Sequence, residues 1–329
     1  MPQEKPYLRE TGSAQELTST YYFYREEEHV QITQAPKPKP RRRWRRQKEA
    51  SLLPEDPNGY IIHTPYVSFH QPPQTLRRGG SKTAPPICLI HNYGLWRRWK
   101  VQFGDRIADA IDPRGVVGWG CRTNPDNSVE DDCALKGYRV RSWRLWAESG
   151  KRYHKEVNAK RKEGVYSEDD LFPHQPVQAD EAISLNWTRP FSRRTRWYQF
   201  QYGGVELCWK GTRSLPEGRK WARRLMPIHH LKLTAKSPGD GGSEVVLAQF
   251  FCSFDWSEYG DLVILDEEVS RVFQCDVLSD DVGLYEKKGG VLDRIHEVII
   301  ATSWCMVLGE FRKRKATIEL LIEIACAWS

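Results

Sequence analysis

The chain has 329 residues, of which 39% are hydrophobic and 12% aromatic, and its formal net charge is +7. This composition is sufficient to bury a substantial core, so it excludes a chain that is disordered throughout. Eight basic residues and no acidic residue fall within the run Lys37–Lys48. The rest of the chain is therefore close to neutral, and the excess positive charge belongs to one N-terminal segment.

Targeting signals and cysteines predict the compartment. The first residues, Met1–Tyr7, contain no apolar segment of the kind that a secretory signal requires. The longest uncharged apolar run, Val298–Gly309, is shorter than the roughly 20 residues that cross a bilayer. The eight cysteines include no Cys-x-x-Cys pair, and Cys305 and Cys326 lie in apolar helical segments where a buried thiol is expected. We therefore expect an intracellular protein, cytoplasmic and/or nuclear and not secreted, with reduced cysteines and no transmembrane segment.

Residues 1–57 have the composition of a disordered basic tail. They are rich in Glu, Gln, Pro, Lys and Arg, and Pro36, Pro38 and Pro40 prevent a regular element from entering the basic run. The aromatic stretch Tyr21–Tyr24 is compatible with either a short strand or a docking motif. The basic run is a candidate for nuclear import, with a solvated run that aids solubility as the alternative. The import candidates are Lys37, Lys39, Arg41, Arg42, Arg43, Arg45, Arg46 and Lys48.

From Tyr66 onward the sequence predicts short strands separated by turns. Trp99–Phe103 alternates apolar with polar residues, and Gly115–Trp119 is a further short strand after a turn at Asp112. The clearest element is a hairpin, because two alternating runs, at 197–202 and 205–209, flank the pair Gly203-Gly204, and the favoured two-residue turn requires positive φ at both positions.

Two further strand regions follow. In Leu231–Lys236 apolar residues alternate with Lys and Thr, and a Gly-rich loop leads into Val245–Phe251, which predicts a second hairpin. Gly260–Leu265 is expected to form another strand.

We place the strand-rich domain at residues 58–315. A charged region separates its two halves. Arg144–Glu163 is compatible with a helix, and Tyr166–Glu181 is acidic and contains Pro173 and Pro176. We interpret residues 144–181 as an insertion in one barrel or, alternatively, as a linker between two domains.

The C-terminal segment from Asp293 predicts a helix that is enclosed by the rest of the protein. Apolar or small residues occupy every face over Val298–Leu308, so no side can face water, and Trp304 and Met306 are expected to be buried. Thr302 and Ser303 are tolerated inside because their hydroxyl groups can bond to carbonyls one turn back. An antiparallel β-barrel closed around this helix removes exposed strand edges and covers the helix.

The order of hairpins, the strand that begins Gly260-Asp-Leu, and the helical segment Leu292–Arg314 (LDRIHEVIIATSWCMVLGEFRKR) resemble the fungal tubby C-terminal-like proteins. These are relatives in fold of tubby, the LURP-one-related proteins and the scramblases. The resemblance covers Tyr66–Lys315 and implies a β-barrel of about a dozen strands threaded by the C-terminal helix. Tubby itself binds membrane phosphoinositide through a basic surface, but none of its ligand residues is carried over to a position in this chain.

The chain departs from the family pattern at its end. Residues 316–329 add a second apolar segment after the basic residues Arg312–Lys315, where the family pattern stops. This segment is compatible with docking on the barrel, with dimerisation, or with an incorrectly read end of the gene.

Motifs of common catalytic sites are missing from the sequence. It contains no Gly-x-Gly-x-x-Gly, P-loop, His-Glu-x-x-His or Gly-x-Ser-x-Gly, and we therefore expect a non-enzymatic protein without cofactor or metal. His229 and His230 are adjacent, so on a strand they point to opposite faces and mark a strand start rather than a metal site. The acidic pairs Glu267-Glu268 and Asp280-Asp281 are interpreted as solvated loop charge.

Two basic clusters interleaved with tryptophan lie outside the N-terminal segment. This composition is typical of surfaces that bind phosphates and stack bases; the alternative is that Trp faces the core and Arg faces water on the same strands. The first cluster spans 139–162, with Trp143 and Trp146 nearby. In the second, near Trp197, Trp209 and Trp221, the anionic-ligand candidates are Arg193, Arg194, Arg196, Lys210, Arg213, Arg219, Lys220, Arg223 and Arg224.

The leading hypothesis is a non-enzymatic binding or scaffold protein that binds anionic lipid headgroups or a protein partner. The alternative is a nucleic-acid-associated protein that uses the Arg- and Trp-rich clusters.

Overall fold

The computed structural model describes most of the strand-rich chain and its C-terminal helix. The described residues are 17–26, 29–36, 56–65, 72–81, 83–93, 98–112, 115–122, 131–138, 155, 158–159, 162–164, 175–187, 197–212, 230–236, 244–253, 257–274 and 285–327. The predictions made for Lys37–Lys48 and for Asp280-Asp281 therefore lie outside the described residues.

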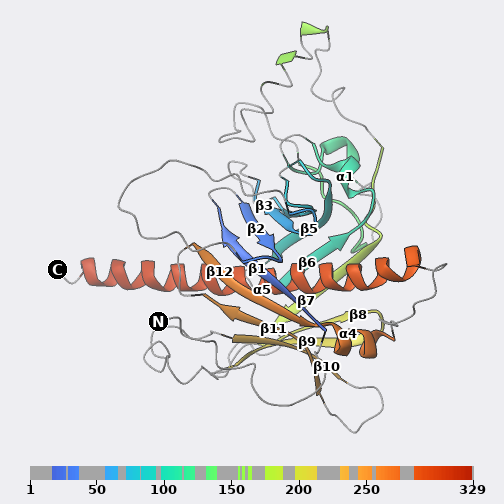
Figure 1. The fold of residues 1–329 in the computed structure, drawn as a ribbon. Coiled ribbons are helices and arrows are strands. Elements are labelled where there is room, and N and C mark those ends of the chain that lie inside the picture. Colours follow the sequence, from blue (N-terminus) through green and yellow to red (C-terminus); the bar gives the residue numbers. More distant parts are fainter. Residues whose placement is uncertain are drawn as a thin grey trace. The chain divides into compact units, whose positions relative to one another are not determined.

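Within the described ranges the fold is mainly β, with twelve strands in a closed antiparallel barrel and one long C-terminal helix (Figure 1). This confirms the predicted closed antiparallel barrel and the helix at its C-terminal end. Around the barrel the strand order is β1-β12-β11-β10-β9-β8-β7-β6-β5-β4-β3-β2. The strands are β1 (Thr18–Arg25), β2 (His29–Thr33), β3 (Tyr60–His63), β4 (Gln74–Arg78), β5 (Pro86–Tyr93), β6 (Arg98–Phe103), β7 (Glu181–Trp187), β8 (Trp197–Tyr202), β9 (Val205–Thr212), β10 (His230–Lys236), β11 (Glu244–Cys252) and β12 (Glu258–Leu265).

The chain divides into two compact units. The first unit comprises Met1–Tyr21 and Asn186–Ser329, and the second comprises Tyr22–Leu185. Each unit is described by itself below.

The hairpins of the first unit follow the sequence pattern. β8 pairs with β9 around Gly203 and Gly204, whose φ angles are +55° and +76°, so the predicted hairpin and its left-handed turn are confirmed. β10 pairs with β11 as expected, with a register shift after Leu233. The predicted strand at Gly260–Leu265 is β12, which begins two residues earlier at Glu258.

The acidic pair Glu267-Glu268 was predicted to be loop charge, and this prediction was wrong. Both residues lie in the first turn of helix α4 (Asp266–Phe273), and Glu268 forms an ion pair with Arg271 one turn later. Acidic side chains are stabilising at a helix N-terminus, because they complement the positive end of the helix dipole. The pattern Asp-Glu-Glu before an apolar position is therefore a helix start.

Helix α5 (Tyr285–Ala327) is longer than expected, because it begins eight residues before Asp293 and continues past the basic residues without a break. Its central part is buried on every face, as predicted: Trp304 and Met306 are each 1% exposed. The Thr302 hydroxyl donates to the carbonyl of Val298 (2.7 Å) and the Ser303 hydroxyl to that of Ile300 (2.8 Å). Within the described residues, no helix combines the length and the apolar composition needed to cross a membrane.

Strands β1 and β2 correct the predicted tail. Residues 18–25 and 29–33, expected to be disordered, form these two strands, which pair from Tyr22↔Thr33 to Arg25↔Val30. Phe23 and Ile32 are fully buried there. The strand interpretation of Tyr21–Tyr24 is therefore confirmed, and the physical reason is the period-two burial of aromatic and β-branched residues, which outweighs the polar composition around it.

The short strand predicted at Gly115–Trp119 is not present. Val117 and Gly118 make only isolated bridges, to Ile111 and Tyr138, and a 3-10 turn (η1, Trp119–Cys121) follows. A short helix, α1 (Ile107–Ala110), precedes this segment. The apolar residues were recognised correctly, but they pack as a bridged loop rather than as a strand.

Residues 175–181, assigned to the charged insertion, belong instead to the folded core. Val177 donates its amide to the carbonyl of Cys121 (3.0 Å), and Ala179 donates to that of Cys133 (2.9 Å). The side chains of Val177 and Ala179 are buried in an apolar cluster with Leu89. Of the helix expected at 144–163, only isolated positions are described, among them one helical bond from Glu163 to Ala159.

Candidate functional site

The two connections that carry most of the second basic cluster in the sequence begin and end at the same end of strands β7 to β10. In the register of the sheet, Trp187 lies opposite Tyr198, Trp197 opposite Lys210, and Thr212 opposite His230. The chain therefore leaves β7, enters β8, leaves β9 and enters β10 at the same end. We call this the basic end: the connections 188–196 and 213–229 together with Lys210. Its two connections contain eight of the nine predicted anionic-ligand residues.

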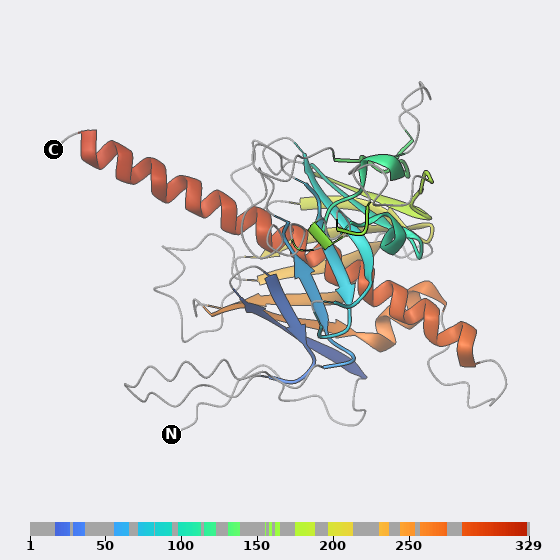
Figure 2. The same cartoon turned by 90° about the horizontal axis from the view of Figure 1, so that it is seen from above.

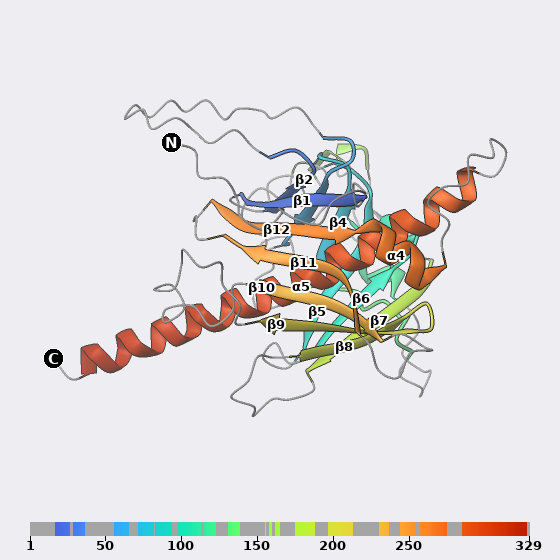
Figure 3. The same cartoon turned by 60° about the horizontal axis from the view of Figure 1, so that its bottom comes forward.

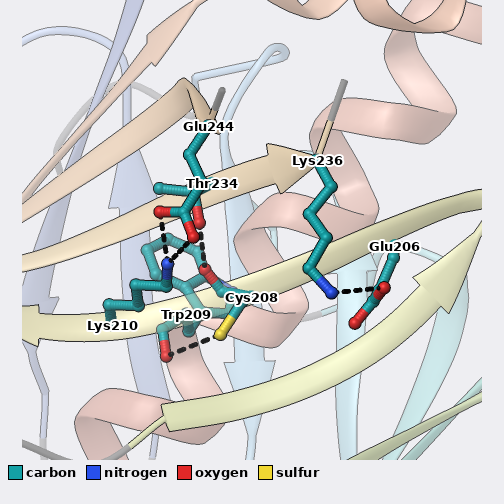
Figure 4. A network of polar contacts seen from close by, with 7 residues as sticks. All are labelled: Glu206, Cys208, Trp209, Lys210, Thr234, Lys236 and Glu244. Carbon is teal, nitrogen blue, oxygen red and sulfur yellow. Dashed lines mark hydrogen bonds and ion pairs between the residues drawn. The ribbon is translucent and has the colours of Figure 1, made fainter. Parts of the chain in front are cut away.

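Lys210 is the candidate of this set that the structure describes. Its ammonium group forms an ion pair with the carboxylate of Glu244 (Figure 4). The same ammonium group lies 4.9 Å from the centre of the Trp197 ring. The Lys210 side chain is 17% exposed, and Lys232 is directly opposite on β10. Glu244 thus offsets repulsion between two facing cations, and an anionic ligand at Lys210 would compete with this carboxylate. The other eight candidates lie outside the described residues.

The outer face of β9 and β10 continues this pairing of charges. Lys236 donates to Glu206 at 2.7 Å, and this hydrogen bond raises the pKa of Lys236 (Figure 4). Between the two ion pairs, the Thr234 hydroxyl donates to the carbonyl of Cys208 at 3.4 Å. Burial raises the pKa of the Cys208 thiol to about 11, so this thiol stays protonated at neutral pH. The face is a cross-strand network that fixes three strands.

His230 occupies the start of β10, as predicted. Its ring stacks on Phe251 with a centroid distance of 4.6 Å, and Nε2 is 3.0 Å from Oε1 of Gln249. Burial, with the nearby charge of Lys232, lowers the pKa of His230 to about 4, so the ring is neutral. Among the described side chains, no group of three or more His, Cys, Asp or Glu residues is arranged to hold a metal ion.

A buried polar chain, which sequence reasoning missed, links three elements of the first unit. The Ser19 hydroxyl of β1 donates to Oδ2 of Asp266 (2.7 Å), and Oδ1 of Asp266 lies 3.0 Å from Nε2 of His296 on α5. The other ring nitrogen, Nδ1 of His296, is 3.2 Å from the hydroxyl of Tyr21. Tyr21, Asp266 and His296 are all buried. In the sequence, the only sign of these polar contacts was a histidine inside an apolar helix, and the sequence did not indicate which residues it would contact.

The order Asp, His, hydroxyl also occurs in general-base sites, where the hydroxyl faces the substrate. Here the Tyr21 hydroxyl faces the interior of the first unit, and its ring meets the His296 ring edge to face at 6.2 Å. These contacts therefore position β1 and α4 on α5, and we assign this set of buried polar contacts a structural role.

A second buried polar cluster lies in the second unit. Nε2 of His91 is 2.8 Å from Oε1 of Gln102, and Nε2 of Gln102 donates to the carbonyls of Asp132 (2.7 Å) and Ala134 (3.0 Å). Burial, with Lys100 among the nearby cations, lowers the pKa of His91 to about 4. The neutral ring thus helps Gln102 to hold residues 131–134 against β6.

The cysteines behave largely as expected. All seven cysteines in the described part of the chain are free thiols. Cys305 is buried as predicted, and desolvation raises its pKa. The prediction for Cys326 was wrong: this residue is exposed, because α5 carries it beyond the buried part of the helix.

Comparison with known proteins assigns no family to this arrangement. No protein-family model, curated protein or solved structure matches the chain.

Proposed function

We propose that this chain is a tubby-like barrel that acts as a non-enzymatic binding or scaffold protein, and that its basic end binds the phosphate groups of anionic lipid headgroups. The observation that carries the proposal is the register of β7 to β10, because it brings both basic connections to one end of the sheet. A cluster that is spread over 32 positions of sequence, from Arg193 to Arg224, becomes local only through this pairing.

The chemistry of the cluster suits phosphate. Seven of the eight connection candidates are arginines, namely Arg193, Arg194, Arg196, Arg213, Arg219, Arg223 and Arg224. Arginine forms bidentate, charge-assisted hydrogen bonds to phosphate oxygens, and several such groups on one rigid framework add their affinities. The paired network around Lys210 and Glu244 supplies the framework, since it fixes β9, β10 and β11 beside the two connections.

Nucleic acid is the alternative anionic partner, because tryptophan near a basic cluster can stack on bases. The resemblance to tubby relatives favours the lipid headgroup. Full-length protein is mixed with liposomes that contain a phosphoinositide, with neutral phosphatidylcholine liposomes and with single-stranded RNA, each over a series of salt concentrations. We expect binding to the phosphoinositide liposomes that weakens as salt rises.

A pair of variants tests the position of the site. Arg223→Ala with Arg224→Ala should weaken phosphoinositide binding at least about tenfold, because two charge-assisted contacts are lost. The matched control is Arg98→Ala with Arg106→Ala, which removes two exposed arginines from the second unit, outside both basic clusters. Selective RNA binding would favour the alternative, and binding to neither probe would leave a protein partner as the ligand.

The nuclear-import prediction for Lys37–Lys48 is a separate proposal about where the protein acts. Replacing Arg41, Arg42, Arg43, Arg45 and Arg46 with Ala should move a fluorescent fusion from nucleus to cytosol without lowering its melting temperature. A fusion that is cytosolic before the substitution would contradict the proposal.

A further inference from the structure

The C-terminal part of α5 leaves the strands of its own unit. Figures 2 and 3 show this end of the helix, in red, extending away from β8 to β12. We call Lys313–Ala327 the terminal arm. Ile322 is 57% exposed and Ile324 is 47% exposed on it. Two large aliphatic side chains are thus in water at the end of a helix whose central part is buried.

The sequence of the terminal arm is too apolar for an isolated helix. After Lys315 it continues Ala-Thr-Ile-Glu-Leu-Leu-Ile-Glu-Ile-Ala-Cys-Ala. Glu319 and Glu323, both exposed, are the ionisable side chains of this stretch apart from Cys326, and they are four residues apart and so share one side of the helix. The remaining sides are aliphatic or small. Large aliphatic side chains that are exposed to water, as Ile322 and Ile324 are, mark an interaction site when they lie in a segment of this composition.

We propose that the terminal arm pairs with the terminal arm of a second copy of this chain, in antiparallel orientation. The inference goes beyond the proposed function, since it uses neither the basic end nor its ligand. In an isologous pair the same apolar side meets itself, and the side that carries Glu319 and Glu323 remains in water on both copies.

Charge decides the orientation and favours a second copy as the occupant. The basic residues Arg312–Lys315 immediately precede the apolar stretch. A parallel pair would place two such runs side by side, which is repulsive. An antiparallel pair centred near Leu320 places each run beside the C-terminal end of the partner helix, where the free carbonyl groups carry partial negative charge. Each arm therefore has a basic end and a partially negative end, and the antiparallel pair brings opposite ends together.

The expected affinity is modest. At about 1.5 Å of rise per residue the arm is about 22 Å long, and two helices of this length bury less surface than a standard stable interface. We expect a dimer with a micromolar dissociation constant, observed as an average mass that rises with protein concentration.

Analytical ultracentrifugation of the full chain tests the proposal. Wild-type protein should approach twice the chain mass at high concentration, whereas Ile322→Lys with Ile324→Lys should remain at the monomer mass over the same range. Val291→Lys is the matched control, because Val291 is a 50% exposed aliphatic residue near the other end of the same helix. A wild-type protein that is monomeric throughout, a dimer that survives the double substitution, or a dimer lost in the control would each overturn the proposal.

Cys326 reports the orientation. In the antiparallel pair the two Cys326 residues are about 18 Å apart along the helix axis, whereas a disulfide requires Cα atoms within about 7 Å. Mild oxidation of the dimer should therefore give no covalent product that depends on Cys326, with Cys326→Ser as the reference. A Cys326-linked dimer would overturn the antiparallel arrangement.

A membrane is the other occupant that an apolar helix end can have. Neutral phosphatidylcholine vesicles test it without involving the basic end. Vesicle binding that the Ile322→Lys and Ile324→Lys substitutions abolish, in a protein that is monomeric in solution, would assign the arm to a lipid surface and overturn self-association.

Discussion

Single polar side chains in the core of the first unit have partners that come from distant parts of the chain. Thr302 is fully buried in α5, and its hydroxyl both donates to the carbonyl of Val298 and accepts from Nε1 of Trp209 on β9, at 3.0 Å. Ser303, its neighbour, is equally buried, but its hydroxyl bonds to the backbone of Ile300. Thr302 thus makes a long-range contact with another element, whereas Ser303 makes only a local contact within its own helix.

We expect Thr302→Val to lower the free energy of unfolding by about 2 kcal/mol, because it leaves the buried indole N–H of Trp209 without an acceptor. Ser303→Ala should cost less, since the acceptor that it loses is a helical carbonyl that is already bonded. Chemical denaturation of both variants measures the difference. Equal losses would show that the Trp209 contact contributes nothing.

His91 should make stability depend on pH. Its pKa is about 4 in the folded protein, against an ordinary value of 6.5, so the unfolded chain binds the proton more readily between these two values. The stabilising contribution is therefore complete above about pH 6.5 and is lost as the pH falls toward 4, with a slope of up to about 1.4 kcal/mol per pH unit. His91→Gln, which keeps a donor for Gln102, should reduce the slope of stability against pH in this window. Identical slopes for wild type and variant would contradict the prediction.

At the scale of elements, local patterns predicted the strands that are regular and missed those that are short or irregular. The Gly203-Gly204 hairpin and β12 follow from alternation and turn chemistry, which act over a few residues. β2 was missed, and β1 was left open between a strand and a docking motif, because their short alternating runs lie in polar, proline-rich surroundings. The bridged loop at Val117 was wrongly predicted as a strand. Its apolar residues pack on α1 and on residues 177–179, and local periodicity carries no information about these contacts.

Replacing two glycines of the first unit with alanine should change stability by very different amounts. Gly260 in β12 has φ +143°, and a Cβ there would overlap the carbonyl oxygen of Phe251 and lie 2.9 Å from Cα of Cys252. Because the obstacle is backbone, Gly260→Ala should cost about 3 kcal/mol or more. Gly204 has φ +76° with no atom within 4 Å of a Cβ, so Gly204→Ala should cost only the left-handed strain of about 1 kcal/mol. Similar unfolding midpoints for the two variants would contradict this ranking.

At the scale of the whole molecule, the candidate site was predictable in composition and not in arrangement. The sequence identifies the arginines and lysines of the two connections, but the register between β7 and β10, which brings the ends of these connections to one end of the sheet, joins residues far apart in the chain. The chain of Ser19, Asp266, His296 and Tyr21 was not predictable for the same reason, since its members are up to 277 positions apart. Burial of α5 was predictable, because a helix that is apolar on every side has no other stable position.

Burial of α5 leads to the strongest prediction about stability. Met306 is 1% exposed on this helix, so Met306→Lys would bury an unpaired ammonium group. The expected cost is about 3–5 kcal/mol or more, a large part of the about 5–15 kcal/mol that stabilises a typical domain. Val291→Lys places the same charge on the same helix at an exposed position and should leave the melting temperature nearly unchanged. Thermal unfolding of both variants tests this prediction. If the Met306→Lys protein had the same melting temperature as the wild type, the centre of α5 would be accessible to water, and the enclosed-helix fold would be wrong.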